Sequence, residues 1–342
     1  MPTADRGPSR GPGHDSDFEG VRLHVVTGKG GTGKTTVAAA LALAQASGGR
    51  RTLLVEVEDR QGIARLFDVP PLPYGERKVA VAPDGGDVFA LAVEPRAALM
   101  EYLDMFYKLG RAGRVLERVG AVDFATTIAP GLRDVLLTGK VYEAVRRREQ
   151  GTPVYDSVVL DAPPTGRITR FLNVNSEVSG LAKVGPIRNQ ADAIMRVLTS
   201  PATAVHLVTL LEEMPVQETL DGVAALTAAG LPVGGVVVNQ VRDELLPSRA
   251  LTAAGKGELD AEAVREGLVT AGLARGDGGA TMVDGLLAEA AGHSARVRLQ
   301  RRERRQLKQL GRPLYDMGYL SGGVDLGGLY DLAEQMCAQG LA

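Results

Sequence analysis

The sequence predicts an α/β protein in which a mostly parallel β-sheet is covered by helices on both faces. Short apolar runs, typical of strands buried on both sides, alternate with longer stretches of helical periodicity. Glycines, carboxylates or an amide follow four of these runs, and in a parallel sheet such positions form the ligand-binding edge. The runs that we expect to be strands are 21–26, 51–57, 88–93, 155–161, 204–210, 233–238 and 313–319.

The helical stretches alternate with these strands in an order that suits a single domain over residues 19–342. Residues 171–200 are expected to form a small helical insert, whereas 247–279 is rich in Gly, Ala and charge and shows no strong pattern. Residues 1–18 are expected to be a disordered tail because Gly, Pro, Asp and Arg predominate there. The main helical stretches are 37–46, 95–150, 215–229, 296–310 and 326–339.

The composition favours a cytoplasmic protein that acts without nucleic acid. The 342 residues, 44% of them hydrophobic, suffice for one large core. The 39 basic and 41 acidic side chains leave a net charge of −2, which creates no field to attract nucleic acid or an anionic membrane. No apolar run is long enough to span a bilayer, so we expect membrane contact only through a partner. Cys337 is the only cysteine, which excludes an intrachain disulfide, and we expect it to be buried.

The loop after the first strand carries the most specific motif of the chain. Residues 28–35, GKGGTGKT, fit the phosphate-loop pattern G-x-x-x-x-G-K-[ST], with a chance glycine-rich turn as the alternative. Because the loop joins a strand to an alanine-rich helix, its N–H groups and the positive end of the helix dipole would face a bound phosphate. Lys34 is expected to reach the β and γ phosphates of ATP, and the Thr35 hydroxyl to coordinate Mg²⁺. The residues expected to bind the nucleotide in this loop are Gly28, Gly30, Gly31, Thr32, Gly33, Lys34, Thr35 and Thr36.

Carboxylates at the ends of two other strands would complete a site for ATP and Mg²⁺. Asp161 ends an apolar strand, as expected of an acid that holds the metal, although a helix cap or a turn is the other explanation. Glu58 follows the second strand and is a candidate to orient or deprotonate the attacking water. Its neighbours Glu56 and Asp59 are rival candidates, and a solvated acidic loop is a further alternative.

The turn that follows Asp161 is stiffened by two prolines. Residues 163–166, PPTG, would bring Pro164 and the neighbouring N–H groups near the γ phosphate. A turn of this kind acts as a switch when nucleotide binding orders it. We therefore add Pro164 to the candidate nucleotide-binding residues.

A second lysine in the phosphate loop, Lys29, adds a different expectation. In isolation it would be a solvated turn residue, but KGGxGKT with this early lysine resembles the deviant Walker A subgroup, which includes the ArsA-type ATPases, MinD and ParA. The resemblance implies a dimer that holds nucleotide between its subunits. It also implies a catalytic role for Lys29, which would neutralise phosphate charge on the nucleotide of the partner.

Within that subgroup the sequence is similar to the ArsA family, which comprises arsenite-pump ATPases and tail-anchored-protein targeting ATPases. Residues 158–172, VVLDAPPTGRITRFL, resemble the family's switch II signature FDTAPTGHTLRFL. The resemblance covers about 21–339 and includes the actinobacterial cytosolic members. It implies that Asn239 recognises adenine and that residues 315–321 wall the base pocket. The other similar stretches are 130–132, 211–214, 237–240 and 313–329.

Departures from the family pattern limit what the resemblance implies. Glu58 stands at the family's catalytic aspartate in switch I, and Arg167 stands at its switch II histidine. The C-x-x-C that ties targeting dimers together through zinc is missing, as are the cysteines of arsenite sensing. The insert between Phe171 and Thr199 is short and lacks a methionine-rich surface, so a groove for client helices is unsupported.

Together, the motifs and the resemblance predict an ATPase that binds ATP and Mg²⁺ in a homodimer or in a heterodimer with a paralogous ATPase. Hydrolysis would drive the opening and closing of the dimer and so act on a protein partner or client. One alternative is the energising ATPase subunit of an anion efflux pump of the arsenite type. Another is a MinD- or ParA-type positioning switch, although residues 326–342 offer neither a basic patch nor an amphipathic targeting helix. A nucleotide sensor that does not hydrolyse ATP is a further alternative because Glu58 is unusual.

Overall fold

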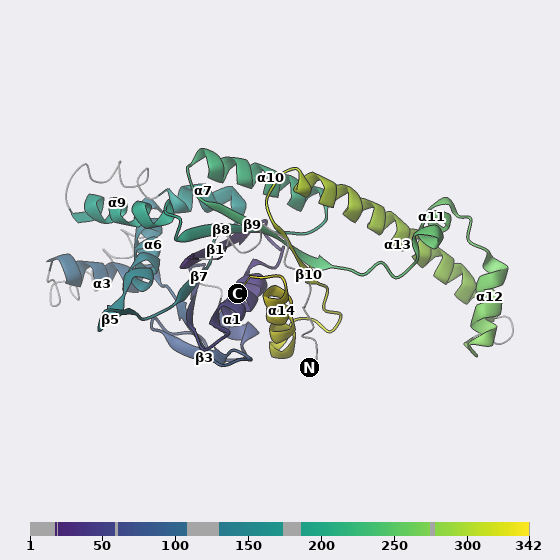
Figure 1. Ribbon diagram of the computed structural model, residues 1–342, viewed down its shortest axis with the longest axis horizontal. Helices are drawn as coiled ribbons and strands as arrows, with labels where there is room; N and C mark the ends of the chain where they lie inside the picture. The colour runs from purple at the N-terminus through teal and green to yellow at the C-terminus, as the bar shows by residue number, and fades with distance from the viewer. Residues whose placement is uncertain are drawn as a thin grey trace, which may run out of the picture.

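Eight strands form one sheet in the computed structural model, which describes residues 18, 20–58, 61–107, 130–173, 186–273 and 278–341. The strand order is β10-β9-β8-β1-β7-β2-β4-β3, and all neighbours are parallel except β3, which runs antiparallel to β4. Strand β1 therefore lies inside the sheet, between β7 and β8 (Figure 1). The strands of the sheet are β1 Leu23–Gly28, β2 Arg51–Glu56, β3 Arg77–Val81, β4 Asp87–Ala92, β7 Ser157–Asp161, β8 Thr203–Thr209, β9 Val233–Val241 and β10 Leu314–Gly318, and a separate hairpin pairs β5 Arg148–Glu149 with β6 Thr152–Pro153.

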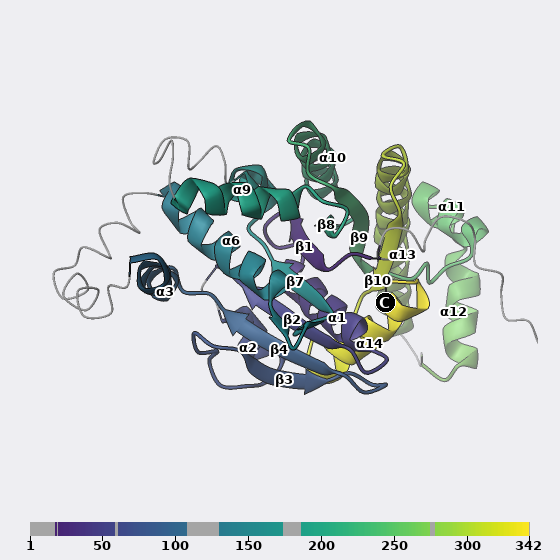
Figure 2. The same ribbon diagram turned by 60° about the vertical axis from the view of Figure 1, so that its left-hand side comes forward.

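Helices cover both faces of the sheet, as the sequence predicts (Figures 1 and 2). Successive side chains of a strand point to opposite faces, so a strand that is covered twice is apolar throughout. In β1, Val25 joins the core on the side of α6 and α7, and Val26 joins the core on the side of α1 and α14. The helices are α1 Lys34–Ala46, α2 Gly62–Leu66, α3 Pro95–Tyr107, α6 Pro130–Arg146, α7 Thr165–Leu172, α9 Pro186–Leu198, α10 Glu213–Ala228, α11 Ser248–Lys256, α12 Ala261–Thr270, α13 Gly278–Lys308 and α14 Leu326–Ala338.

Helix α1 places the phosphate loop at the carboxyl end of β1. All its residues from Val37 to Ala46 are buried, between the sheet and α14. Most of them are alanine, which has the highest helix propensity and lets neighbouring elements approach closely. Gly33 precedes the helix in the left-handed conformation, with φ of 88°. This packing holds the N-terminus of α1 in a fixed position beside the loop.

Each of the seven runs predicted to be strands overlaps a strand of the sheet, whereas β3 was not predicted. Strand β3 lies at the edge of the sheet, where its residues are half-buried or exposed and include Arg77 and Lys78. Charged residues on an edge strand discourage pairing with other chains, but they also remove the apolar signal by which a strand is recognised.

The region 247–279, which shows no strong pattern in the sequence, is folded into helices in its described part. It contains α11, α12 and the start of α13, which begins at Gly278 rather than near residue 296. Helix α12 buries none of its side chains, and Val264 and Leu268 alone are large apolar residues at helical spacing within it, which is a weak signal. Its beginning is instead fixed by Asp260, whose carboxylate accepts hydrogen bonds from the N–H groups of Glu262 and Ala263.

The expected burial of Cys337 is wrong. Helix α14 buries Leu329, Leu332, Ala333 and Met336 at helical spacing, and Cys337 lies on the exposed side. Of the predicted tail, only Phe18 is among the described residues, and its ring stacks on that of His206 at 4.9 Å. The described residues also leave out 108–129 from the stretch 95–150, and 174–185 from the predicted insert.

Helices α11, α12 and α13 form an arm that extends away from the sheet (Figures 1 and 2). The C-terminal end of α13 is anchored to the body, because Leu307 packs with Val236 and Val238 of β9. Helix α11 packs on α13, where Ser294 Oγ donates a hydrogen bond of 2.7 Å to the carbonyl of Leu251. None of the helices in the described residues combines the length and the apolar character needed to span a bilayer.

Candidate active site

Two glycines of the phosphate loop are required by its packing. Gly28 ends β1 with φ of 154°, and a Cβ at this position would lie 2.2 Å from the carbonyl oxygen of Val208 on β8. Gly33 has φ of 88°, and its Cβ would lie 2.3 Å from Asn239 Nδ2. A larger residue would therefore be strained and would displace either β8 or Asn239. The loop keeps its close approach to both neighbours because these two positions are glycine.

The N-terminus of α1 offers donors to an anion. No side-chain hydrogen bond caps this helix within the part of the chain that the structure describes. The first N–H groups of a helix are satisfied in such loops by phosphate oxygens, and the helix dipole adds attraction. Lys34 opens the helix and is only 9% exposed, so its ammonium lies inside the site rather than in solvent. The cradle of backbone donors and the buried lysine fit a polyphosphate.

Thr35 and Asp161, the two residues predicted to hold Mg²⁺, lie side by side. Thr35 Oγ1 donates a hydrogen bond of 2.7 Å to Asp161 Oδ2. Burial raises the pKa of Asp161 to about 6, even though the Thr35 hydroxyl and the charge of Lys34 favour the carboxylate, and negative charge on Glu56 and Glu58 adds to the rise. Oxygen ligands are what Mg²⁺ prefers, and its positive charge would stabilise the ionised form of Asp161. The pair therefore fits the predicted metal.

The turn after β7 connects the phosphate loop to α7. Thr27 Oγ1 donates a hydrogen bond of 2.7 Å to the carbonyl of Pro163, and Pro164 is the N-cap residue of α7. Proline has no N–H group, so any backbone donor that this turn aims at a phosphate belongs to Thr165 or Gly166. The sequence predicted Pro164 as a nucleotide-binding residue, but its backbone offers no donor, so the N–H groups that the turn can contribute are those of Thr165 and Gly166.

A cavity of 210 Å³ lies beside the phosphate loop, between the end of β9 and the segment that follows β10. Asn239 is buried there, and its Nδ2 donates a hydrogen bond of 2.9 Å to the carbonyl of Thr32. The guanidinium of Arg242 lies 3.7 Å from the ring centroid of Tyr319. Tyr319 and Leu320 line the cavity, whereas Tyr315 is fully buried in the core. The remaining lining residues are Gly33, Thr36, Gln240, Gly318, Gly323, Val324 and Leu332.

Lys29 is more exposed than Lys34 and pairs with an acid of α10. Its Nζ is 2.8 Å from Glu218 Oε1 on α10, and the side chains are 28% and 36% exposed. Thr165 Oγ1 donates a hydrogen bond of 3.4 Å to the other carboxylate oxygen of Glu218. Glu218 thus contacts both the phosphate loop and the first residue of α7. No sequence pattern indicates this role, because Glu218 lies in an ordinary helix far from the phosphate loop along the chain.

A protein-family model described as anion-transporting ATPase matches residues 21–201, which include the phosphate loop, Asp161 and the PPTG turn. The chain belongs to this ArsA ATPase family. It is an ATPase, and the cradle formed by the loop and α1 is the expected place for its nucleotide.

The relatives of this ArsA-family ATPase agree with that assignment. ATPase BagA of Mycobacterium tuberculosis (strain ATCC 25618 / H37Rv) is 55% identical over 330 residues, which cover 96% of each chain. ATPase GET3 of Kluyveromyces lactis is 28% identical over 255 residues, 63% of this chain and 71% of that protein. A protein of Prosthecochloris vibrioformis named as an arsenical pump-driving ATPase is 25% identical over 268 residues, 65% of this chain and 62% of that protein.

The two residues that depart from the family's switch signatures lie close together in this ArsA-family ATPase. Arg167 Nη1 is 3.9 Å from Glu58 Oε1, and Glu58 is 19% exposed. Glu56, the nearest rival of Glu58, is buried at the end of β2, where its Oε1 accepts a hydrogen bond of 3.0 Å from the N–H of Gly62. Asp59, the other rival, lies outside the described residues. Glu58 is therefore the more accessible of the two described candidates for contact with water.

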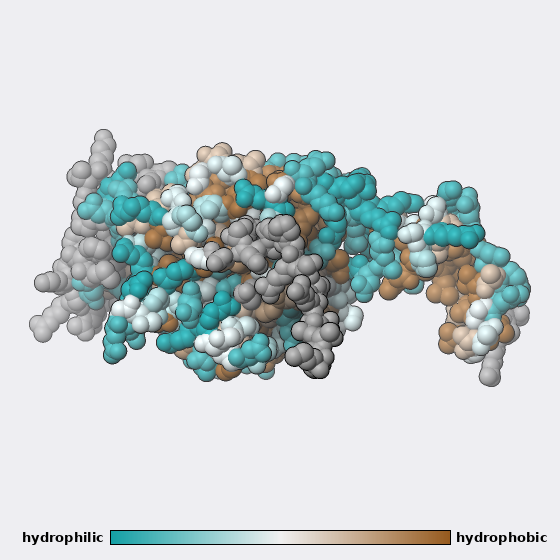
Figure 3. Space-filling view, in the orientation of Figure 1, coloured by the Kyte–Doolittle hydropathy of each residue, from teal (hydrophilic) through white to brown (hydrophobic). Residues whose placement is uncertain are grey.

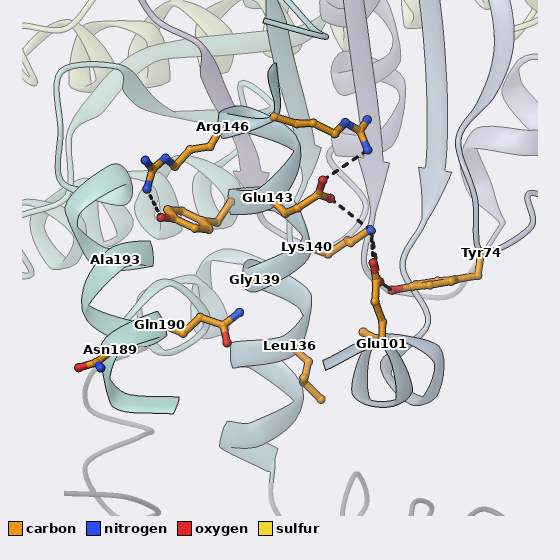
Figure 4. Close-up of a pocket in the computed structure, with 13 residues that line it drawn as sticks. Tyr74, Glu101, Leu136, Gly139, Lys140, Glu143, Arg146, Asn189, Gln190 and Ala193 are labelled. Atoms are coloured by element: carbon orange, nitrogen blue, oxygen red, sulfur yellow. Dashed lines mark hydrogen bonds and ion pairs between the residues drawn. The ribbon is translucent and has the colours of Figure 1, made fainter. Parts of the chain in front are cut away.

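A second cavity, of 780 Å³, lies away from the phosphate loop between α3, α6 and α9 (Figure 4). Glu101 accepts a hydrogen bond of 2.6 Å from the hydroxyl of Tyr74 and lies 3.0 Å from Lys140 Nζ. Glu143 contacts both Lys140, at 3.2 Å, and Arg147, at 3.4 Å. These pairs neutralise Lys140 and Arg147 in the cavity wall, whereas the guanidinium of Arg146 donates to the neutral hydroxyl of Tyr142.

Proposed function

We propose that this ATPase binds MgATP in a dimer and uses hydrolysis to open and close that dimer on a protein partner. The observation that carries the proposal is the opposite placement of the two loop lysines. Lys34 is buried in its own site, whereas Lys29 lies at the surface and is held by Glu218. Because Glu218 holds Lys29 while Lys34 occupies the site of its own subunit, Lys29 would serve a nucleotide held by a second subunit.

In the proposed site, backbone N–H groups of the loop and Lys34 would hold the phosphates. Thr35 and Asp161 would hold Mg²⁺, which supplies positive charge for the phosphoryl oxygens. Glu58 would orient the attacking water and accept its proton, and Arg167 would hold the Glu58 carboxylate in place. The cavity beside Asn239 supports a base site, since it adjoins the loop and has one polar and one aromatic wall.

Coupling to a partner would run through α7. Its N-terminus is the PPTG turn, its first residue touches Glu218, and it packs against α6 and α10. A nucleotide that pulls on Thr165 or Gly166 would therefore shift α7 and also disturb the ion pair that holds Lys29. The same event would order the switch and release the lysine for the second subunit.

The test compares alanine substitutions at the two lysines. Lys34→Ala should lose both nucleotide affinity and turnover, whereas Lys29→Ala should keep nucleotide affinity and lose turnover together with MgATP-dependent dimer formation. Lys78→Ala on β3, where the lysine is exposed and pairs with Asp87, is the matched control and should change neither. If Lys34→Ala leaves ATP affinity and turnover unchanged, the assigned site is wrong.

A second candidate, the energising subunit of an anion pump, is favoured by the family description and by the name of the Prosthecochloris relative. The single cysteine counts against a thiolate site for arsenite, because Cys337 is exposed on α14. A pull-down with Glu58→Gln protein, held in MgATP or in ADP, separates the candidates. Recovery of a soluble partner only in MgATP supports the first, and recovery of a membrane channel supports the pump.

A further inference from the structure

The arm has an exposed apolar patch that none of the described residues covers. Four large apolar side chains lie at its tip: Val269, Leu273, Met282 and Leu286, which are 58%, 65%, 44% and 40% exposed. Figure 3 shows apolar surface along the arm beside α12 and the start of α13. Helix α12 spans 10 residues and buries none of them. A helix this short is marginal without tertiary packing, so the tip lacks part of its stabilising surface.

On one side of α13, two charged residues follow the apolar residues of this patch along the helix. Met282, Leu286, Glu289 and Arg296 follow each other at spacings of four, three and seven residues, which places them on one side of the helix. Glu289 and Arg296 are both exposed, and neither forms an ion pair within the described parts of the chain. They are two turns apart, about 10 Å along the helix, so they do not neutralise each other.

The charge along α13 is divided between its halves. Residues 278–295 contain Asp284 and Glu289 and no Lys or Arg, whereas 296–308 contain seven basic residues and a single acid, Glu303. A helix dipole accounts for acids and bases only in the first and last turns. Arg301, Arg302 and Arg304 already pair with acids of the same chain. The other bases of this half could face the acidic half of a second α13, which makes the helix surface self-complementary.

We propose that the arm is a self-association surface and that its partner is a second copy of this chain. Two α13 helices would cross antiparallel near Gly292 and His293, so that Glu289 of each copy meets Arg296 of the other. In a two-fold interface each contact occurs twice, and Glu289 and Arg296 are equidistant from that centre. A Cβ at Gly292 would meet no atom within 4 Å, which leaves room for a close crossing. The apolar tip of each arm would then lie over the root of the other.

Charge supports a protein partner over a lipid surface. The tip carries exposed acids at Glu266, Asp284 and Glu289, which an anionic bilayer would repel. The net charge of −2 is too small to keep two copies apart. This association needs no nucleotide, so it is separate from the MgATP-driven dimer proposed above.

Charge reversal tests the proposal on the full chain without nucleotide, with self-association measured by sedimentation velocity over a wide concentration range. Glu289→Arg and Arg296→Glu should each weaken association about ten-fold or more, because each places like charges opposite one another twice. An equimolar mixture of the two variants should associate as well as the original chain, and so should the double variant. Val269→Asp should also weaken association.

Two controls address folding and specificity. Glu334→Arg on α14 and Val81→Asp on β3 make matched changes at exposed positions outside the arm, and they should leave association unchanged. Circular dichroism should show that all variants keep their helical content. The proposal would be overturned if the original chain did not associate at any concentration, or if Glu289→Arg left its association unchanged. It would also be overturned if the mixture of the two variants failed to restore association. If MgATP still produces a dimer in that case, the proposed function stands and only the arm interface falls.

Discussion

Lys29 and Glu218 join the phosphate loop to α10 through an ion pair of 2.8 Å, and Thr165 donates a hydrogen bond to the same carboxylate. Three segments that are far apart in the sequence thus meet at Glu218. If Lys29 acts on the nucleotide of a second subunit, this ion pair has to break first. The contact would then set a threshold for dimer formation.

Removing the charge of Glu218 should lower that threshold. The pair is about one-third exposed, and such pairs contribute a fraction of 1 kcal/mol to about 1 kcal/mol. Glu218→Gln should therefore lower the protein concentration needed for MgATP-dependent dimer formation about two- to five-fold. Sedimentation in MgATP measures this, with Glu334→Gln as control. A variant that dimerises less readily would show that Glu218 supports the dimer instead of restraining it.

Glu58 should be needed for hydrolysis but not for binding. General-base groups contribute about 10²- to 10⁴-fold to rate, so Glu58→Gln should lower kcat by about 10²-fold or more and leave ATP affinity nearly unchanged. Glu58→Asp should retain much of the activity, because it restores the residue found at this place in the ArsA family. Steady-state turnover and nucleotide titration measure the two quantities, with Glu149→Gln on β5 as control. Equal turnover in Glu58→Gln and the original chain would assign the water to another residue.

The ionised carboxylate of Asp161 should lower the free energy of unfolding when no metal is present. Its pKa rises from an ordinary 3.8 to about 6 in the folded protein, so the folded state favours the neutral acid. The stability it contributes is complete below pH 3.8 and is lost as the pH rises towards 6. Asp161→Asn should therefore raise metal-free stability by up to about 3 kcal/mol at pH 7 and have little effect near pH 4. Thermal melts across this pH range would contradict the assignment if the difference did not vary with pH.

The buried histidine pair should make stability fall as the pH is lowered, which is the opposite of the effect of Asp161. His24 Nδ1 and His206 Nε2 are 3.1 Å apart, and burial lowers the pKa of His206 to about 4 and that of His24 well below 6.5. Stability from the neutral rings is complete above pH 6.5 and is lost as the pH falls towards 4. His206→Gln keeps a hydrogen-bonding group and should reduce the acid-dependent loss by up to about 3 kcal/mol. The change in unfolding free energy between pH 7 and pH 4.5, compared in both proteins, measures this.

The sheet and the phosphate loop could be predicted from sequence because their signals are local. Strand β1, the loop and α1 are consecutive, and each has its own pattern of apolar, glycine or alanine residues. Asp161 could be identified because it ends an apolar strand, and Asn239 because of the family resemblance. The roles of these residues stay predictions, although the structure places them around one loop.

The contacts of Glu218 and the helices of the arm could not be predicted. Glu218 meets Lys29 across 189 residues of sequence, and nothing near either residue announces the pair. Helix α12 was missed because it has no buried face, and of α13 only the charged second half was predicted, as 296–310.

The arm also has a mechanical consequence for the base cavity. It is a single excursion of the chain that leaves the sheet after β9 and returns at β10, so Asn239 lies just before it and Tyr319 just after it. The 31 residues of α13 form a lever of about 45 Å, whose C-terminal end is anchored beside those strands. A force on the tip of the arm would therefore displace β9 and β10 relative to each other. The two walls of the cavity would move apart or together, and the affinity for the base would change.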